Sequence, residues 1–236
     1  MLLERLQRPV RGVRIVRKDP SVSHPGQISA QIIPQRRLTN HEITATLAQL
    51  KDVPGRVVTS ALSESEQAQF LDAGFEQYEA LYLLRHDLRD RPRRSPGRHR
   101  MRTGRRGDLS TVLDIDQRSF DEFWAMDRDA FHAAKKATPV HRYQVATINR
   151  RVVGYAINGR AGSSSFLQRL GVDPAVRGEG IGSDLVLDAF DWAVANGAAS
   201  MLVNTQVSNT NARRLYERLG FTLADERLHV LEWKRS

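Results

Sequence analysis

The sequence of 236 residues contains no cysteine, which excludes disulfides, a cysteine nucleophile and thiolate metal sites. No apolar run approaches the ~18 to 20 residues that a membrane-spanning helix needs, and Met1 is not followed by the apolar stretch of a signal peptide. We therefore expect no membrane partner and a cytoplasmic location. No spacing of His, Asp and Glu argues for a metal ion, so none is predicted.

The composition is that of a folded protein with a sizeable core. Hydrophobic residues make up 40% and charged residues 27% of the chain. Because 236 residues exceed the usual ~100 to 200 per domain, two domains are expected. We predict a smaller α/β domain at 1–88, an Arg/Pro-rich linker at 89–97 and a larger domain at 98–236.

The net charge of +9 is concentrated in one segment, residues 85–107, where ten arginines face two aspartates. Prolines and glycines in the same segment favour a solvated connector. The alternative is an accessory site for nucleic acid or for another acidic partner. Since aromatic residues hardly occur among these arginines, specific stacking on bases is disfavoured.

Hydrophobic periodicity predicts a mixture of strands and helices in both halves. In the first half we expect strands at 12–16, 27–33, 56–62 and 81–85 and helices at 39–50 and 64–73. In the second half we expect helices at 108–119, 121–135, 183–196 and 209–219 and strands at 99–102, 143–148, 152–157, 165–172, 201–207 and 228–234. A hairpin turn is expected at Asn149 and Arg150.

The most informative stretch joins a predicted strand to a predicted helix and reads Leu-Gly-Val-Asp-Pro-Ala-Val-Arg-Gly-Glu-Gly-Ile-Gly over 170–182. Glycines at such a junction allow a tight turn that gathers backbone N–H groups, and the helix adds its positive N-terminal end. This construction suits a phosphate group, and Arg177 adds a cation. A plain turn would need fewer glycines, and neither a dinucleotide fingerprint nor a P-loop is present.

The pattern Arg177-x-x-Gly180-x-Gly182, preceded by Leu-Gly-Val-Asp-Pro, closely resembles the acyl-CoA loop of the GNAT superfamily of N-acetyltransferases. A second stretch, Asn209-x-x-Ala-x-x-Leu-Tyr216-Glu-x-Leu-Gly-Phe, resembles the family's segment after the next strand. The resemblance covers residues 98–236. It implies an α/β fold with a central mixed, mostly antiparallel sheet flanked by helices.

The resemblance also implies acetyl-CoA as co-substrate and assigns residues to it. Main-chain groups of the strand edge would pair with the pantetheine amides: Leu170, Gly171 and Val172. Backbone amides of the loop would hold the pyrophosphate: Arg177, Gly178, Glu179, Gly180, Ile181, Gly182 and Ser183. Asn209 would contact the cofactor, and Tyr216, with a reference pKa of ~10, would protonate the departing thiolate. Without the motif, Tyr216 would be read as a core aromatic.

The implied reaction is direct attack of a primary amine on the thioester in a ternary complex, with a small molecule or a peptide as acceptor. The general base stays open among Asp116, Asp121, Glu122, Glu226 and a bound water, and His141 and His229 have no better claim. The acids at 114–129 could attract a cationic amine or form a solvated helix face. A longer acyl-CoA is an alternative to acetyl-CoA. A rival function is a non-catalytic acyl-CoA-binding or sensing module with a nucleic-acid or protein partner.

The first half repeats part of the order of the second, because residues 56–85 and 201–231 both read strand, helix, Gly-Phe, strand. When Gly74-Phe75 is superposed on Gly220-Phe221, Phe70 replaces Tyr216, and residues 34–39 contain no glycine. We expect a degenerate GNAT-like half without catalytic competence; two unrelated α/β pieces are the alternative. Such a half could shape the acceptor site or form a homodimer.

Overall fold

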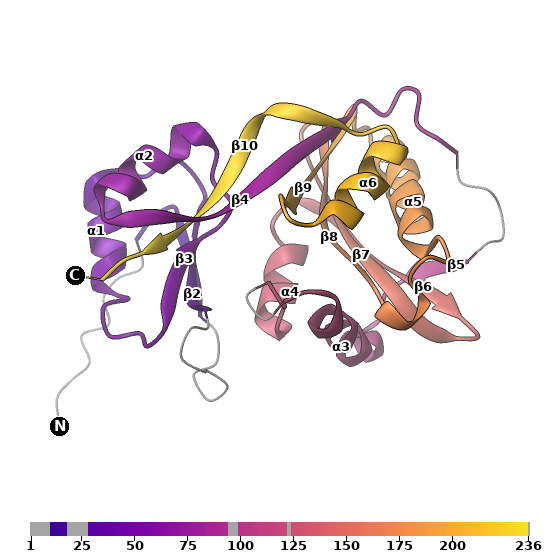
Figure 1. Cartoon of the computed structure of the whole chain (residues 1–236), viewed down its shortest axis with the longest axis horizontal. Helices are drawn as coiled ribbons and strands as arrows, with labels where there is room; N and C mark the ends of the chain where they lie inside the picture. Colours follow the sequence, from indigo (N-terminus) through magenta and orange to yellow (C-terminus); the bar gives the residue numbers. More distant parts are fainter. Residues whose placement is uncertain (1–9, 18–27, 94–98, 122–123, 236) are drawn as a thin grey trace. The chain divides into compact units, whose positions relative to one another are not determined.

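The chain folds as two units, each built on β-strands that are covered by helices (Figure 1). The computed structural model describes residues 10–17, 28–93, 99–121 and 124–235. Unit 1 comprises residues 1–81 and 226–236, and unit 2 comprises residues 82–225. Of the sequence-based predictions, Glu122 and residues 94–97 of the linker at 89–97 lie outside the described residues.

Unit 1 begins with an antiparallel pair, β1 and β2, and β2 then pairs in parallel with β3. The helix α1 connects these two parallel strands. Strand β10, from the end of the chain, lies antiparallel beside β3 through Glu232 and Val58. The bounds are β1 Val13–Arg17, β2 Ile28–Pro34, α1 Asn40–Ala48, β3 Arg56–Thr59, α2 Glu64–Asp72, β4 Phe75–His86 and β10 Thr222–Trp233.

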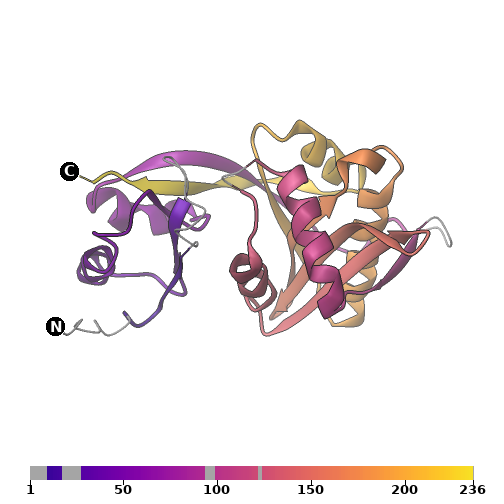
Figure 2. The ribbon, with the colours of Figure 1, turned by 90° about the horizontal axis from the view of Figure 1, so that it is seen from below.

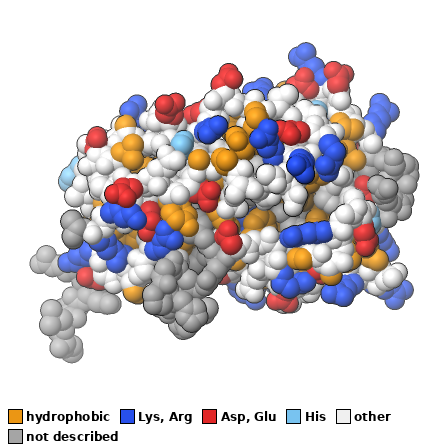
Figure 3. Space-filling model, viewed as in Figure 1, with side chains coloured by type: hydrophobic (Ala, Val, Ile, Leu, Met, Phe, Trp, Pro, Cys, Tyr) orange, Lys and Arg blue, Asp and Glu red, His pale blue; other side chains and the backbone are white. Residues whose placement is uncertain are grey.

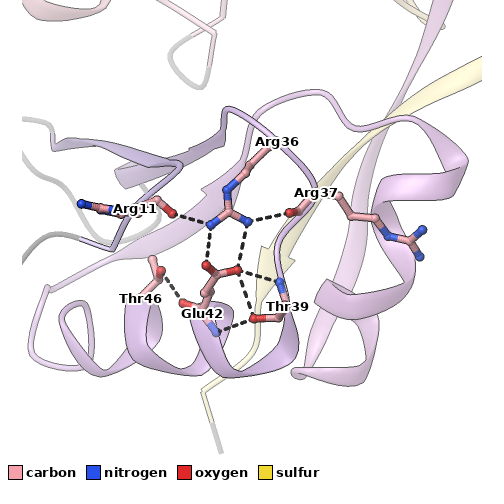
Figure 4. Close-up of polar contacts among 6 residues, drawn as sticks. All are labelled: Arg11, Arg36, Arg37, Thr39, Glu42 and Thr46. Carbon is pink, nitrogen blue, oxygen red and sulfur yellow. Dashed lines mark hydrogen bonds and ion pairs between the residues drawn. The ribbon is translucent and has the colours of Figure 1, made fainter.

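Helix α1 starts where the sequence supplies a capping box. Thr39 Oγ1 accepts from the N–H of Glu42 at 3.3 Å, and the Glu42 carboxylate accepts from the N–H of Thr39 at 2.9 Å (Figure 4). Ile43 and Leu47, one turn apart, are buried in the core of this unit with Ile32 and Leu231.

In unit 2 the strands follow one another in the order β4-β9-β8-β7-β6-β5. All neighbouring pairs from β5 to β8 are antiparallel, whereas β8 and β9 are parallel. The expected class, a mixed α/β fold with a mostly antiparallel sheet, is confirmed. The bounds are β5 Arg100–Thr103, α3 Leu109–Ser119, α4 Arg128–Lys135, β6 Val140–Ile148, β7 Arg151–Ala161, β8 Ser164–Val172, α5 Ile181–Ala195, β9 Ser200–Gln206 and α6 Thr210–Arg218.

Helices cover both faces of the sheet of unit 2, and each face has its own core (Figure 2). On the α5 face, Ala156 and Leu167 pack with Leu185 and Phe190. On the α3 face, Tyr155 and Ile157 of β7 pack with residues of α3 and α4. Because successive strand residues point to opposite faces except at a β-bulge, this division places Tyr155, Ala156 and Ile157 on alternating faces.

The two units share an order of elements. An antiparallel hairpin (β1–β2 or β7–β8) is followed by a helix, a parallel strand and a second helix in both. The strand that follows the second helix ends in the other unit in both cases. Strand β4, after α2, ends beside β9 in unit 2, and β10, after α6, ends beside β3 in unit 1. No local pattern in the sequence predicts this exchange.

Most predicted elements are confirmed within a few residues, and three are wrong in extent. The strand predicted at 81–85 begins at Phe75. The helix predicted at 121–135 begins only at Arg128, because Asp127 provides the N-cap by accepting from the N–H of Ala130 at 2.7 Å. The closing strand begins at Thr222 rather than at 228. The turn at Asn149 and Arg150 is confirmed, with both residues at positive φ. Among the described residues, no helix is long and apolar enough to cross a membrane.

Candidate functional site

Strands β8 and β9 diverge in the middle of β8. Their parallel pairing runs from Ser164 and Ser200 to Phe166 and Leu202 and goes no further, although β8 continues to Val172. We call the region beyond this last pair the strand opening. Backbone groups on this side of β8 are not used by β9, so an extended ligand can hydrogen-bond to them as an added strand would.

The loop after β8 carries the predicted phosphate cradle. Gly178 and Gly180 adopt φ of 87° and 89°, a left-handed conformation that L side chains rarely adopt. Gly180 is the N-cap of α5, and the N–H of Asp184 is the first to bond back along the helix, to Gly180 O at 3.0 Å. The backbone N–H groups of Ile181, Gly182 and Ser183 therefore precede the intrahelical bonds and can donate hydrogen bonds to an anion at the positive end of the helix.

The end of β8, the loop and α6 converge at Gly182. A Cβ placed on Gly182 would lie 3.3 Å from Leu215 Cδ2 and 3.7 Å from Val172 Cγ2. Gly171 is held just as closely on the other face, because a Cβ there would lie 2.4 Å from Cε1 of Tyr155. The structure thus brings the predicted strand edge, the loop and the second motif together.

The charged residues of the loop are accessible. Arg177 and Glu179 are exposed, and Arg177 Nη2 donates to Ser119 O at 3.4 Å. The loop is anchored by Asp173, which is buried and accepts from Arg118 Nη1 at 2.7 Å and from the N–H of Ala175 at 3.1 Å. Asp173 thus holds the start of the loop, while Arg177 further along it stays exposed.

The second motif forms the start and the middle of α6. Asn209 caps the helix, its Oδ1 accepting from the N–H of Ala212 at 3.1 Å. Tyr216 is 5% exposed and its ring lies 5.5 Å from that of Phe221. No hydrogen bond of its hydroxyl is formed within the described part of the chain. Burial raises the pKa of Tyr216 well above its ordinary value, against an opposing effect of Arg169, so the phenol stays protonated at neutral pH.

Asp116 is a poor candidate for the general base. It is fully buried, and its two carboxylate oxygens accept from Arg169 Nε and Nη2, both at 2.8 Å, and from the hydroxyl of Tyr155 and the N–H of Met126. A carboxylate so fully paired has no oxygen left to take a proton from a substrate. Sequence reasoning missed its partner Arg169, because no spacing relates two residues 53 positions apart.

The other acidic candidates serve local structure. Asp121 is exposed, and its Oδ1 accepts from the N–H of Trp124 at 3.1 Å. In unit 1, Glu226 Oε1 accepts from the N–H of Glu64 at the start of α2. His141 is exposed, and His229 belongs to unit 1, where its backbone pairs with Leu62. None of these contacts identifies a base.

Two residues of the basic segment, Arg91 and His99, lie against acidic residues on one face of α5 within unit 2. Asp184, Asp188 and Asp191 follow one another at helical spacing. His99 Nδ1 lies 2.6 Å from Asp184, Arg91 lies 3.5 Å from Asp191, and Arg142 of β6 pairs with Asp188. On the face shown in Figure 3, basic side chains likewise occur with acidic ones between them.

Comparison with known proteins supports the interpretation of this region. A model of the acetyltransferase (GNAT) family matches residues 109–221, from α3 to the end of the second motif. An uncharacterized N-acetyltransferase of Methanocaldococcus jannaschii is 30% identical over 125 residues, which cover 48% of this chain and 72% of that protein. The chain belongs to the GNAT family of acetyltransferases.

Other relatives of this GNAT protein share less of its length or sequence. A mycothiol acetyltransferase of Streptosporangium roseum is 46% identical over 56 residues, which cover 24% of this chain and only 17% of that protein. A tandem GNAT protein from the clavulanic acid biosynthesis pathway superposes with a TM-score of 0.63 over 90% of this chain and 77% of its own, at 13% identity. The second similarity concerns the fold alone.

Proposed function

We propose that the protein transfers an acetyl group from acetyl-CoA to a primary amine by direct attack within a ternary complex. The observation that carries this proposal is the strand opening with the glycine loop at its end. The opening offers hydrogen-bonding groups to an extended chain, and the loop offers free N–H groups to a phosphate. Acetyl-CoA joins an extended, amide-containing arm to a pyrophosphate, so its two parts suit these two features.

In this reaction, the neutral amine nitrogen bonds to the thioester carbonyl carbon, the carbon–sulfur bond breaks, and the amine loses a proton. Main-chain groups of Leu170, Gly171 and Val172 would align the pantetheine, and backbone amides of 177–183 would hold the pyrophosphate. Asn209 would contact the cofactor from the start of α6. The buried phenol of Tyr216 would give its proton to the departing thiolate.

The topology of unit 1 supports the proposal that it is a degenerate copy of the catalytic fold. It has the same order of hairpin, helix, parallel strand and helix, but Phe70 stands where unit 2 has Tyr216. We propose the division into an N-terminal domain, a basic linker and a catalytic domain on this basis. A role of unit 1 in acceptor binding or in a homodimer, an acidic partner for the linker and a cytoplasmic location remain predictions.

The function is tested by calorimetry with acetyl-CoA, followed by release of free CoA thiol in the presence of a panel of peptide and small-molecule amines. The protein has no cysteine to add background. Thiol release that depends on one class of amine is the expected result. Binding without turnover on any amine would favour a non-catalytic acyl-CoA sensor, and absence of binding would refute the proposal.

The loop is tested in the same titration with Gly182→Val. A branched side chain there would meet Leu215 and Val172 and block the approach of phosphate, so binding should be lost. Gly107→Val is the matched control, because Gly107 has no atom within 4 Å of an added Cβ. A folded Gly182→Val protein that binds normally would contradict the assignment of the loop.

A further inference from the structure

Strand β8 contains one extra residue at the point where it leaves β9. Opposite β7, Ile157 pairs with Arg169 and Asn158 pairs with Leu167, so Gln168 has no partner of its own. This is a β-bulge, which changes the direction of neighbouring side chains. It lies just beyond Phe166, the last residue of β8 that pairs with β9.

The bulge turns two successive side chains to the same face of the sheet. Leu167 packs in the core on the α5 face, and Leu170 packs against that core. Arg169 bonds to Asp116 of α3 on the opposite face. Gln168 also lies on the α3 face, because a Cβ on Gly159, which alternates with Tyr155 and Ile157, would lie 2.7 Å from Gln168 Nε2.

Gly159 leaves the space that the side chain of Gln168 occupies. An added Cβ would also lie 2.2 Å from Thr138 Oγ1, so any other residue at 159 would displace both neighbours. Gln168 Nε2 donates to Thr138 Oγ1 at 3.4 Å, which fixes the orientation of the amide. Its Oε1 is buried and accepts no hydrogen bond from any residue that the structure describes.

A buried carbonyl oxygen without a donor is unfavourable until a partner arrives. Gln168 lies two residues beyond Phe166, the last residue of β8 that pairs with β9, and its side chain is on the face opposite α5. The neighbouring residue Arg169 is already paired with Asp116, so its charge is balanced. The carbonyl oxygen of Gln168 is therefore a neutral hydrogen-bond acceptor without a free cation beside it. Such a group fits the N–H of an amine better than an anion.

We propose that Gln168 is a positioning residue for the acceptor, its Oε1 accepting a hydrogen bond from the amine that attacks the thioester. This bond would orient the nitrogen lone pair toward the carbonyl carbon and would discriminate against substrates without an N–H at that place. The inference rests on the proposed transferase function and adds a residue to its acceptor side.

The test is Gln168→Leu, assayed with the amine of the panel that gives the fastest thiol release. The loss of one buried hydrogen bond to the acceptor should raise KM for the amine, or lower kcat, about tenfold or more. The calorimetric affinity for acetyl-CoA should not change. Gln168→Glu keeps an oxygen acceptor and should recover much of the lost activity.

Gln144→Leu is the matched control. Gln144 Oε1 is also buried without a donor among the described residues, but Gln144 pairs with Ala156 and lies on the α5 face. Its replacement should leave KM for the amine unchanged. Unchanged kinetics in Gln168→Leu, or equal losses in the two leucine variants, would overturn the inference while the transferase function stands. If the unaltered protein acetylates no amine, the proposed function fails and this inference with it.

Discussion

Tyr216 has two roles to reconcile, one from its place in the second motif and one from its burial. Its position in the second motif makes it the proposed proton donor, and its burial in the α5 core makes it a packing residue. The two roles are compatible, because burial raises the pKa of the phenol, so the hydroxyl still carries its proton at neutral pH, while the same shift makes it a weaker acid. The substitution Tyr216→Phe therefore removes the hydroxyl and keeps the packing of the ring.

We expect Tyr216→Phe to lower kcat about 100-fold, within the range for loss of a general acid, while the affinity for acetyl-CoA stays the same. The phenylalanine ring keeps the contact with Phe221, so the fold should be preserved. Steady-state kinetics and calorimetry measure the two quantities. Unchanged turnover would remove Tyr216 from the mechanism.

At the scale of elements, the buried ion pair of Asp116 and Arg169 ties α3 to β8. Arg169 also donates to Trp124 O at 2.7 Å, and its guanidinium carbon lies 3.5 Å from the centroid of the Phe120 ring. The pair thus fixes the segment after α3 against the strand that carries Gln168. Breaking a buried pair of this kind destabilises the folded state, chiefly because the remaining partner would be a buried charge without a counter-charge.

Asp116→Asn should therefore lower the free energy of unfolding by about 3 to 5 kcal/mol, since it leaves Arg169 buried and unpaired. Urea denaturation measures the change. Asp114→Asn, in the same helix but exposed, is the control and should stay within about 0.5 kcal/mol of the unaltered protein. A similar small loss for Asp116→Asn would show that the pair does not hold α3 to β8.

At the scale of the whole molecule, the two units share one order of elements, so unit 1 has to be considered as a second cofactor site. In unit 1 the helix after β2 is α1, and the side chain of Glu42 lies at its N-terminus. Glu42 accepts from Thr39 and from Arg36, whose Nη2 lies 2.5 Å from Oε1 (Figure 4). The hydrogen bond from Arg36 lowers the pKa of Glu42 to about 2, so this carboxylate is ionised at neutral pH.

The carboxylate of Glu42 puts a negative charge at that place, the N–H of Glu42 already donates to Thr39 Oγ1, and no glycine opens the loop. We therefore expect one acetyl-CoA per chain in calorimetry. Gly182→Val should reduce the stoichiometry to zero rather than leave a second site. A stoichiometry of two would show that unit 1 also binds the cofactor.

The sequence by itself determined the family, the glycine loop and the second motif, because phosphate binding and helix capping depend on neighbours within a few positions. It also predicted most helices and strands, since their periodicity is local. The helix predicted at 121–135 failed because the N-cap at Asp127 starts a new helix within an apolar pattern that looks continuous.

Only the tertiary structure decided which residues meet across the sheet. The pairing of Asp116 with Arg169, the bulge at Gln168 and the exchange of β4 and β10 all depend on the register and the order of strands. Register is set by packing between segments far apart in the chain, so no local pattern encodes it. For that reason the proposed cofactor side of the site could be argued from the sequence, while the proposed acceptor residue required the fold.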